Sequence, residues 1–154
     1  ATAMPKTANC PEVTALLGVF ALYWKVDACI DDAPEAPELN RMESHLLIGL
    51  DEPRRMGELA RRMQTVPSTV TAAADSLELL GLIRRERDPT DRRAWQLVLT
   101  PAGQVQRAAL QNAAAELFRE VSGLSEEETQ QFAALSAKIH DNILATETKP
   151  SGKE

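Results

Sequence analysis

Arginine is concentrated in the middle of this 154-residue chain. Nine arginines and six acidic residues lie between positions 54 and 93, which gives that stretch a net charge of +3. The remainder has eight basic and seventeen acidic residues and carries −9. A planar guanidinium can bind phosphate or the edge of a base through two parallel hydrogen bonds. The central stretch therefore has the chemistry of a polyanion-binding surface, although a solvated charged face would have the same composition.

Two groups of side chains within this stretch could direct such contacts. Short hydroxyl donors occur at Ser68, Thr69 and Thr71, directly after a proline. Arg92 and Arg93 lie in a run rich in turn-forming residues. Hydroxyl and guanidinium groups are both common donors to phosphates and bases.

The elements that would position these side chains are two short helices and a hairpin. Residues 57–63 predict a helix with Gly57 at its N-cap. Pro67 suits the first turn of a second helix, which ends at Gly81 in a left-handed conformation. Its buried stripe has helical spacing and consists of Val70, Ala74, Leu77 and Leu80. Two short helices joined by a tight turn predict a helix-turn-helix.

A β-hairpin is predicted directly after the second helix. Residues 82–87 and 94–100 have the composition of strands, and apolar and polar side chains alternate in the second of them. Turn-forming residues, Asp88 and Pro89 among them, separate the two strands. This hairpin would form a wing beside the helix-turn-helix.

Longer helices are predicted on both sides of this unit. Residues 11–30 are apolar around most of the helix circumference, so we expect a dimer interface there, and 39–50 predict a second helix. Thr100 and Pro101 open a long helix that ends near residue 123. A capping box at 125–128 opens the last one. The expected fold is mainly α with a small β-hairpin wing.

The composition, with 44% hydrophobic and 26% charged residues, is typical of a globular domain. The longest apolar run, 15–24, is shorter than the roughly 18 residues needed to span a bilayer. The first residues lack the basic and apolar segments of a secretory signal, and two cysteines cannot build a disulfide scaffold. We therefore expect a cytoplasmic protein with no membrane segment.

Five short segments resemble the MarR family of bacterial transcriptional regulators. They are Leu59-Ala60, Pro67-Ser68-Thr69-Val70-Thr71, Leu80-Gly81-Leu82-Ile83, Asp88-Pro89-Thr90-Asp91-Arg92-Arg93 and Leu99-Thr100-Pro101-Ala102-Gly103. The resemblance is close over about residues 54–103, and the order of the helices on both sides fits the family. Asp91 and Arg93, followed by Leu99 and Thr100, match its wing signature.

The resemblance implies a sequence-specific DNA-binding regulator that is not an enzyme and needs no cofactor or metal ion. Residues 1–154 would form a single MarR-like domain, with a winged helix-turn-helix DNA-binding region at 39–100 and dimerisation helices at 10–31 and 101–146. A homodimer would bind a palindromic operator in double-stranded DNA as a repressor. A small molecule, often phenolic in this family, would release it.

The resemblance also assigns roles to residues. The second helix of the motif would enter the major groove, and the wing would reach the minor groove. The predicted contacts from this recognition helix are Ser68, Thr69 and Thr71. Arg93 matches the arginine of the wing tip, and Asp91 matches the acid that pairs with it. The remaining predicted DNA contacts are four arginines: Arg54, Arg85, Arg87 and Arg92.

One departure from the family concerns base reading. Recognition helices of the family commonly carry an arginine just after the Ser-Thr-Val-Thr run and another four residues later, where this chain has Ala72 and Ser76. Bidentate guanine contacts from this helix are therefore not available. More of the affinity must come from the wing and from the other arginines.

An effector site is implied where the dimer helices meet the winged unit. The candidate lining residues are Tyr23, Trp24, Met42, His45 and Leu46. Aromatic and methionine side chains at helical spacing also occur in an ordinary core, so each of these residues has that second interpretation.

Other functions remain open from the sequence. Some members of the family sense oxidation, but Cys10 and Cys29 would be about 28 Å apart along one straight helix, so a bridge would have to join two subunits. A winged helix could also bind only protein. An enzyme is disfavoured because no phosphate-binding loop or nucleophile motif occurs. His45 and His140 show no metal-ligand spacing with the cysteines.

Overall fold

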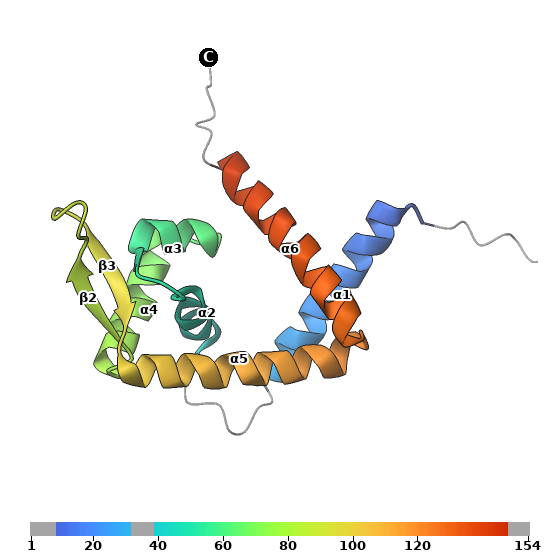
Figure 1. The fold of residues 1–154 in the computed structure, drawn as a ribbon, viewed down its shortest axis with the longest axis horizontal. Helices are drawn as coiled ribbons and strands as arrows, with labels where there is room; N and C mark the ends of the chain where they lie inside the picture. The colour runs from blue at the N-terminus through green and yellow to red at the C-terminus, as the bar shows by residue number, and fades with distance from the viewer. Residues whose placement is uncertain (1–8, 32–38, 148–154) are drawn as a thin grey trace, which may run out of the picture.

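The computed structural model describes residues 9–31 and 39–147, in which six helices and three short strands follow one another (Figure 1). The elements are α1 (Pro11–Asp31), α2 (Arg41–Gly49), β1 (Arg54–Arg55), α3 (Met56–Arg62), α4 (Pro67–Leu79), β2 (Ile83–Arg87), β3 (Trp95–Leu99), α5 (Pro101–Ser122) and α6 (Glu126–Glu147). The predicted fold class, mainly α with a small hairpin wing, is confirmed.

Local sequence signals set most of the boundaries. Gly81 follows α4 with a φ of 74°, as its left-handed cap requires. The capping box before α6 is formed, because the amide of Ser125 donates to Glu128 over 3.0 Å and the amide of Glu128 donates back over 3.2 Å. The start of α3 differs from the prediction. The helix begins at Met56, so Arg55 rather than Gly57 occupies the N-cap position.

The sheet has three antiparallel strands in the order β1-β3-β2. The hairpin register pairs Ile83 with Leu99 and Arg87 with Trp95. β1 was not predicted, because two residues carry no periodicity and their pairing with β3 joins segments about forty residues apart in the chain. This short strand attaches the start of α3 to the base of the wing.

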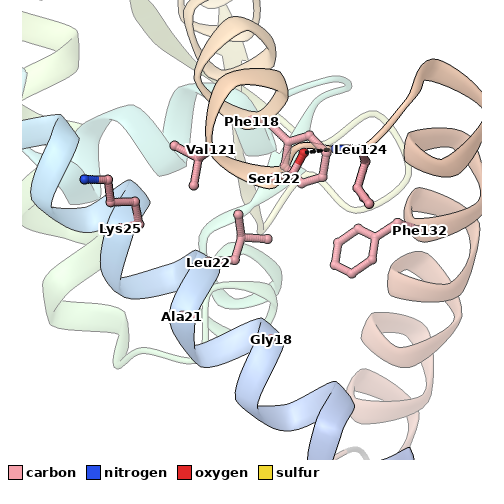
Figure 2. Close-up of a pocket in the computed structure, with 9 residues that line it drawn as sticks. All are labelled: Gly18, Ala21, Leu22, Lys25, Phe118, Val121, Ser122, Leu124 and Phe132. Atoms are coloured by element: carbon pink, nitrogen blue, oxygen red, sulfur yellow. Dashed lines mark hydrogen bonds between the residues drawn. The ribbon is translucent and has the colours of Figure 1, made fainter.

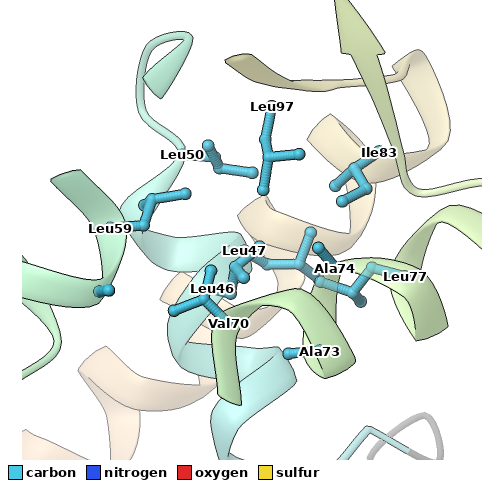
Figure 3. Packing of buried hydrophobic residues seen from close by; sticks show 11 residues of the cluster. Leu46, Leu47, Leu50, Leu59, Val70, Ala73, Ala74, Leu77, Ile83 and Leu97 are labelled. Carbon is cyan, nitrogen blue, oxygen red and sulfur yellow. The ribbon is translucent and has the colours of Figure 1, made fainter. Parts of the chain in front are cut away.

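The hydrophobic core lies within the winged unit (Figure 3). Its eleven side chains come from α2, α3, α4, the sheet and the residue after α2: Leu46, Leu47, Leu50, Leu59, Ala60, Val70, Ala73, Ala74, Leu77, Ile83 and Leu97. Among the side chains whose exposure is described, none from α1 or α6 is fully buried. The winged unit is thus the part of the chain that builds its own core.

A close backbone contact attaches α5 to this unit. The Thr100 hydroxyl donates to the Gly81 carbonyl over 2.6 Å and accepts from the Gly103 amide, so it is the N-cap of α5. A Cβ placed on Gly103 would lie 1.9 Å from the Leu82 carbonyl oxygen, so only glycine fits there. The Leu-Thr-Pro-Ala-Gly segment therefore has a structural role.

The other end of α5 meets α1 and α6, away from the winged unit (Figure 1). Both of these helices expose large apolar side chains: Val13, Leu16, Leu17, Val19, Phe20, Tyr23 and Trp24 on α1, and Leu135, Ile139 and Ile143 on α6. Trp24 is 66% exposed and stacks on Phe20 with the ring centres 5.8 Å apart. None of the helices in the described ranges is long and apolar enough to cross a membrane.

Candidate nucleic-acid interface

The first turn of α4 is exposed and uncapped. Within the described part of the chain no side chain caps it, and the turn itself carries no acidic residue. Ser68 is exposed and Thr69 half-buried, whereas the hydroxyl of Thr71 donates to the Pro67 carbonyl over 2.9 Å. A helix N-terminus carries a partial positive charge and free amides, both of which favour phosphate. The structure thus places the three predicted hydroxyl donors on one exposed helix end.

The turn of the wing is organised by Asp88, which was not among the predicted site residues. Its carboxylate accepts the Thr90 amide over 2.8 Å and the Thr90 hydroxyl over 2.7 Å. The same group accepts from Arg55 Nε over 2.7 Å, and the side chain is only 12% exposed. Aspartate two residues before a turn amide is the usual sequence signal of an Asx turn. Asp88 fixes the turn and joins it to β1.

The wing tip presents two arginines. Within the described ranges, the guanidinium groups of Arg92 and Arg93 have no hydrogen bond or ion pair, and both residues are exposed. The predicted pair between the Asp91 carboxylate and the Arg93 side chain is not formed. The carboxylate instead accepts the backbone amide of Arg93 over 3.1 Å. Asp91 therefore shapes the loop while the Arg93 side chain stays free.

Arg87 braces this loop from the strand. Its Nη1 donates to the Arg92 carbonyl over 2.7 Å, and its guanidinium lies 4.5 Å from the centre of the Trp95 ring. A cation over an indole face is held by the ring quadrupole. Arg87 remains exposed, so it supports the tip without losing its access to a ligand.

The hydrogen bonds to Asp88 should make part of the stability depend on pH. Those from Thr90 and then Arg55 hold the pKa of the Asp88 carboxyl well below its usual range. Such a group stabilises the folded state above its unfolded pKa of about 3.9, and this contribution is lost as the pH falls towards the folded value. We expect Asp88→Asn to destabilise the protein at pH 7 and by a smaller amount at pH 3, as measured by urea unfolding. The control is Asp141→Asn, whose side chain is 81% exposed. If the difference in the free energy of unfolding between wild type and Asp88→Asn stayed constant from pH 7 to pH 3, this role would be contradicted.

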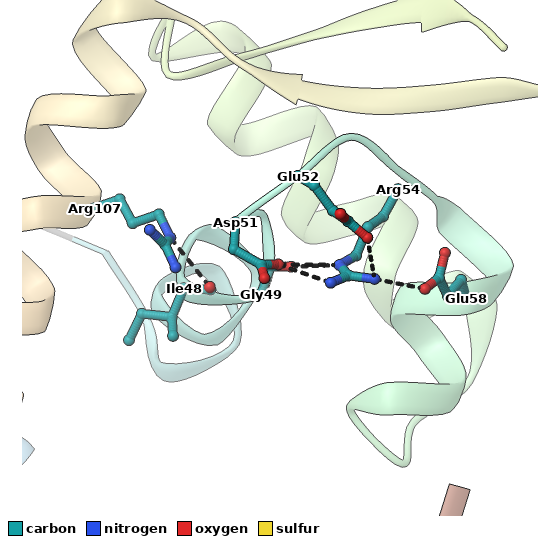
Figure 4. A network of polar contacts seen from close by, with 7 residues as sticks. All are labelled: Ile48, Gly49, Asp51, Glu52, Arg54, Glu58 and Arg107. Atoms are coloured by element: carbon teal, nitrogen blue, oxygen red, sulfur yellow. Dashed lines mark hydrogen bonds and ion pairs between the residues drawn. The ribbon is translucent and has the colours of Figure 1, made fainter. Parts of the chain in front are cut away.

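The structure corrects the prediction that Arg54 contacts DNA (Figure 4). This arginine is only 7% exposed. Its guanidinium donates to Asp51 over 2.8 Å, to Glu58 over 2.6 Å and to the Gly49 carbonyl over 3.0 Å. With these donors bound inside the protein, Arg54 joins α2 to α3 rather than facing a ligand.

Arg85 is corrected for a related reason. Arg85 of β2 donates to Asp75 on α4, and its Nε lies 3.3 Å from a carboxylate oxygen of Glu78 on the same helix. Of the nine central arginines, Arg54, Arg55, Arg84 and Arg85 form ion pairs. In the described part of the chain, the arginines of this set without an acidic partner are Arg61, Arg62, Arg87, Arg92 and Arg93. They lie at the end of α3 and in the wing.

The predicted effector residues differ in their exposure to solvent. Leu46 is fully buried in the core, so it cannot line an open pocket, and that prediction is wrong. Met42 packs against the core. Tyr23, Trp24 and His45 are exposed, and the pKa of the His45 imidazole is lowered by desolvation and by nearby Arg41.

An apolar pocket of about 490 Å³ lies elsewhere, at the corner of α1, α5 and α6 (Figure 2). Phe118 and Phe132 face into it, with their ring centres 5.8 Å apart, and Leu22 and Val121 add apolar surface. Lys25 is at its edge and is the charged residue of this lining. The lining residues come from three helices and the turn after α5, so no single segment of sequence indicates this pocket.

The two cysteines lie near opposite ends of α1. Cys10 directly precedes α1 and is exposed, and Cys29 lies two residues before the end of the helix. Because α1 is continuous between them, they are about 28 Å apart and cannot bridge within the chain.

The helix-turn-helix with its hairpin wing defines a winged helix-turn-helix protein. The family model described as "MarR family" matches residues 40–95, which are the winged unit. The transcriptional repressor MdtR of Bacillus subtilis is 32% identical over 126 residues, which are 80% of this chain and 81% of MdtR. The chain belongs to the MarR family of transcriptional regulators.

Solved structures agree with this assignment. The regulator BldR from Sulfolobus solfataricus is 27% identical, with a TM-score of 0.66 over 83% of this chain and 94% of BldR. YusO from Bacillus subtilis is 30% identical, with a TM-score of 0.55 over 88% of this chain and 99% of YusO.

Proposed function

We propose that this regulator binds a palindromic operator as a homodimer and represses transcription until a small aromatic molecule releases it. The observation that carries the proposal is the face formed by the start of α4, the end of α3 and the wing tip. The hydroxyl donors occupy the first turn of α4, and the five arginines without acidic partners in the described ranges lie at the end of α3 and on the wing. A local basic surface on an acidic chain directs phosphate to one side of the molecule.

The exposed apolar helices support the homodimer. Seven large apolar residues of α1 are at least 40% exposed, and the α6 residues add to them, although neither helix belongs to the core. Apolar surface of this extent on a single chain marks a protein interface. We propose residues 10–31 and 101–146 as dimerisation segments and residues 39–100 as the DNA-binding region of one MarR-like domain.

Repression and release are proposed from relatives. MdtR is named a repressor. CouR from Rhodococcus jostii RHA1, 20% identical, has been solved with p-coumaroyl-CoA, and the structure of BpsR from Bordetella bronchiseptica, 17% identical, concerns regulation of its DNA binding by 6-hydroxynicotinic acid. Both ligands are aromatic, which sets the class to test. A regulator of transcription without catalysis of its own would act in the cytoplasm, where bacterial DNA lies.

The DNA proposal is tested with purified protein and fragments of the source genome. We expect selection of a small set of inverted repeats, bound by a species of twice the chain mass in sedimentation. Affinity should fall about a thousandfold between 50 and 200 mM salt if about six phosphates are contacted. Binding of all fragments alike, or an affinity that ignores salt, would contradict the proposal and favour a protein-binding module.

The effector proposal is tested on the selected operator. Phenolic acids and their coenzyme A thioesters are added to the complex at fixed salt, and release of DNA is followed by fluorescence anisotropy. Release by a subset of these compounds is expected. If none releases the operator at millimolar concentration, while the dimer remains intact, an aromatic effector is ruled out and the repressor proposal stands alone.

A further inference from the structure

The C-terminal end of α2 is held by two arginines from other elements. Its last turn contains no basic residue, although the carbonyls at a helix end need donors and carry a partial negative charge. Arg107 of α5 donates from Nε to the Ile48 carbonyl over 3.2 Å. Arg54 of β1 donates from Nε to the next carbonyl, that of Gly49, over 3.0 Å (Figure 4).

These two contacts belong to a continuous hydrogen-bond network. Arg54, which binds the Gly49 carbonyl, also donates from Nη1 to Glu58 Oε1 of α3 over 2.6 Å. Asp51 lies between the two arginines in Figure 4, and its carboxylate accepts a hydrogen bond from Arg54 over 2.8 Å. Both arginines lower the pKa of the Asp51 carboxyl, Arg54 more strongly through its hydrogen bond. Helix α5 is thus connected through α2 to the first helix of the helix-turn-helix.

A cleft adjoins Arg107 where α5 meets the turn after α2. This cleft, of about 280 Å³, separates α5 from the turn after α2, and both Arg107 and Asp51 line it. Leu110, one turn further along α5, packs against the core, whereas residues 111–116 are all exposed. Among the described residues, Arg107 therefore makes the last polar contact between α5 and the winged unit.

Because Arg107 lies far from the C-terminal end of α5, a small rotation of the helix at Arg107 would move that end by several ångströms. From Arg107 to Ser122 the helix extends about 22 Å at 1.5 Å per residue. A rotation of about 10° at the attachment would move the far end by about 4 Å, close to the 3.4 Å rise of one base-pair step. In a dimer joined through α1, α5 and α6, this movement would change the separation of the two recognition helices.

We propose that Arg107 is a positioning residue that fixes the angle between the winged unit and α5, and thereby the operator spacing that the dimer accepts. This inference rests on the proposed operator-binding homodimer. Arg107 itself lies on α5, outside the DNA-facing surface, so its effect is on geometry and not on phosphate contacts. Arg54 connects the same end of α2 to α3, because it donates both to the Gly49 carbonyl and to Glu58.

The test uses the full chain and inverted-repeat duplexes made from the operator that the wild type selects. Their spacers are lengthened or shortened by one or two base pairs. We expect the wild type to prefer one spacer by about tenfold over its neighbours. Arg107→Met should bind that spacer several-fold more weakly and should discriminate among the spacers by less than about threefold. Arg107→Lys keeps a cationic donor within reach of Ile48 and should restore most of the preference.

Arg84→Met is the matched control, because it removes the same charge from an exposed position outside both the proposed DNA-facing surface and the proposed dimerisation segments. It should keep the wild-type spacer preference. An unchanged preference in Arg107→Met, or an equal loss in both variants, would overturn the inference. If the wild type itself shows no spacer preference, the proposed palindromic binding fails instead. Should Arg107→Met not fold, as judged by circular dichroism, Arg107→Gln is used and the same loss of preference is expected.

Discussion

Replacing Gly103 by alanine should lower the free energy of unfolding by about 3 kcal/mol, the upper part of the range for overpacking a well-packed site. The added Cβ would lie 1.9 Å from the Leu82 carbonyl oxygen and 2.9 Å from its carbon. Both atoms are backbone, so no side-chain rotation can relieve the contact. The Leu82 carbonyl also accepts the Thr100 amide over 3.1 Å, so moving it would break the attachment of α5.

The control for this substitution is Gly57→Ala. Gly57 also lies in the first turn of a helix, but a Cβ there would meet nothing within 4 Å. Alanine should leave the stability unchanged or raise it by up to about 1 kcal/mol, because glycine is the poorer helix former. Urea unfolding followed by circular dichroism measures both variants. A loss below about 1 kcal/mol in Gly103→Ala would show that the α4–β2 turn and α5 separate easily, against the close contact described above.

The elements of the winged unit could be predicted because their signals are local. Thr100 and Pro101 mark a helix start within two residues, and Gly81 marks a helix end by its own backbone conformation. Strand β1 has no such signal. Its two residues form a strand only because β3, far along the chain, provides the pairing partner.

The charge pattern predicted the basic character of the surface but not which arginines belong to it. Arg54 and Arg85 are in the same basic stretch as Arg93, yet acids on neighbouring elements bind the first two. For Arg54 a signal was present, since Asp51 and Glu58 lie three and four residues away. For Arg85 the partner is ten residues away on α4, and only the packing of strand against helix brings it near.

The candidate effector site shows a different limit of prediction. The resemblance implies a site lined by Met42, Leu46 and aromatic residues of α1, but Leu46 is buried in the core. The rotation of a short helix about its axis depends on what covers it, and the sequence of α2 alone does not fix this. The pocket at Phe118 and Phe132 depends in turn on how α5 and α6 meet, which is a property of the turn after Ser122.

The largest effect on DNA binding is expected from Arg93→Ala, which should weaken operator binding by about 1–3 kcal/mol. Asp91 holds the backbone of Arg93, and Arg87 holds the neighbouring carbonyl of Arg92. The loop is therefore ordered before DNA arrives, and little conformational entropy is lost when the free guanidinium binds. Fluorescence anisotropy with the selected operator gives the affinity, and sedimentation should show that the dimer remains.

Arg84→Ala is the matched control for this prediction. Arg84 lies on the same hairpin and is similarly charged, but its Nε donates to Glu86 over 2.6 Å and it is outside the proposed face. Removing the Arg84 side chain should change operator affinity by less than about threefold.

If Arg93 enters a narrow minor groove, the wild type should prefer A/T-rich flanks beside the half-sites, because such grooves attract cations most strongly. Arg93→Ala should lose that preference, whereas Arg84→Ala should keep it. A uniform loss on A/T-rich and G/C-rich flanks would instead place Arg93 on a phosphate, and an unchanged affinity would remove the wing tip from the interface.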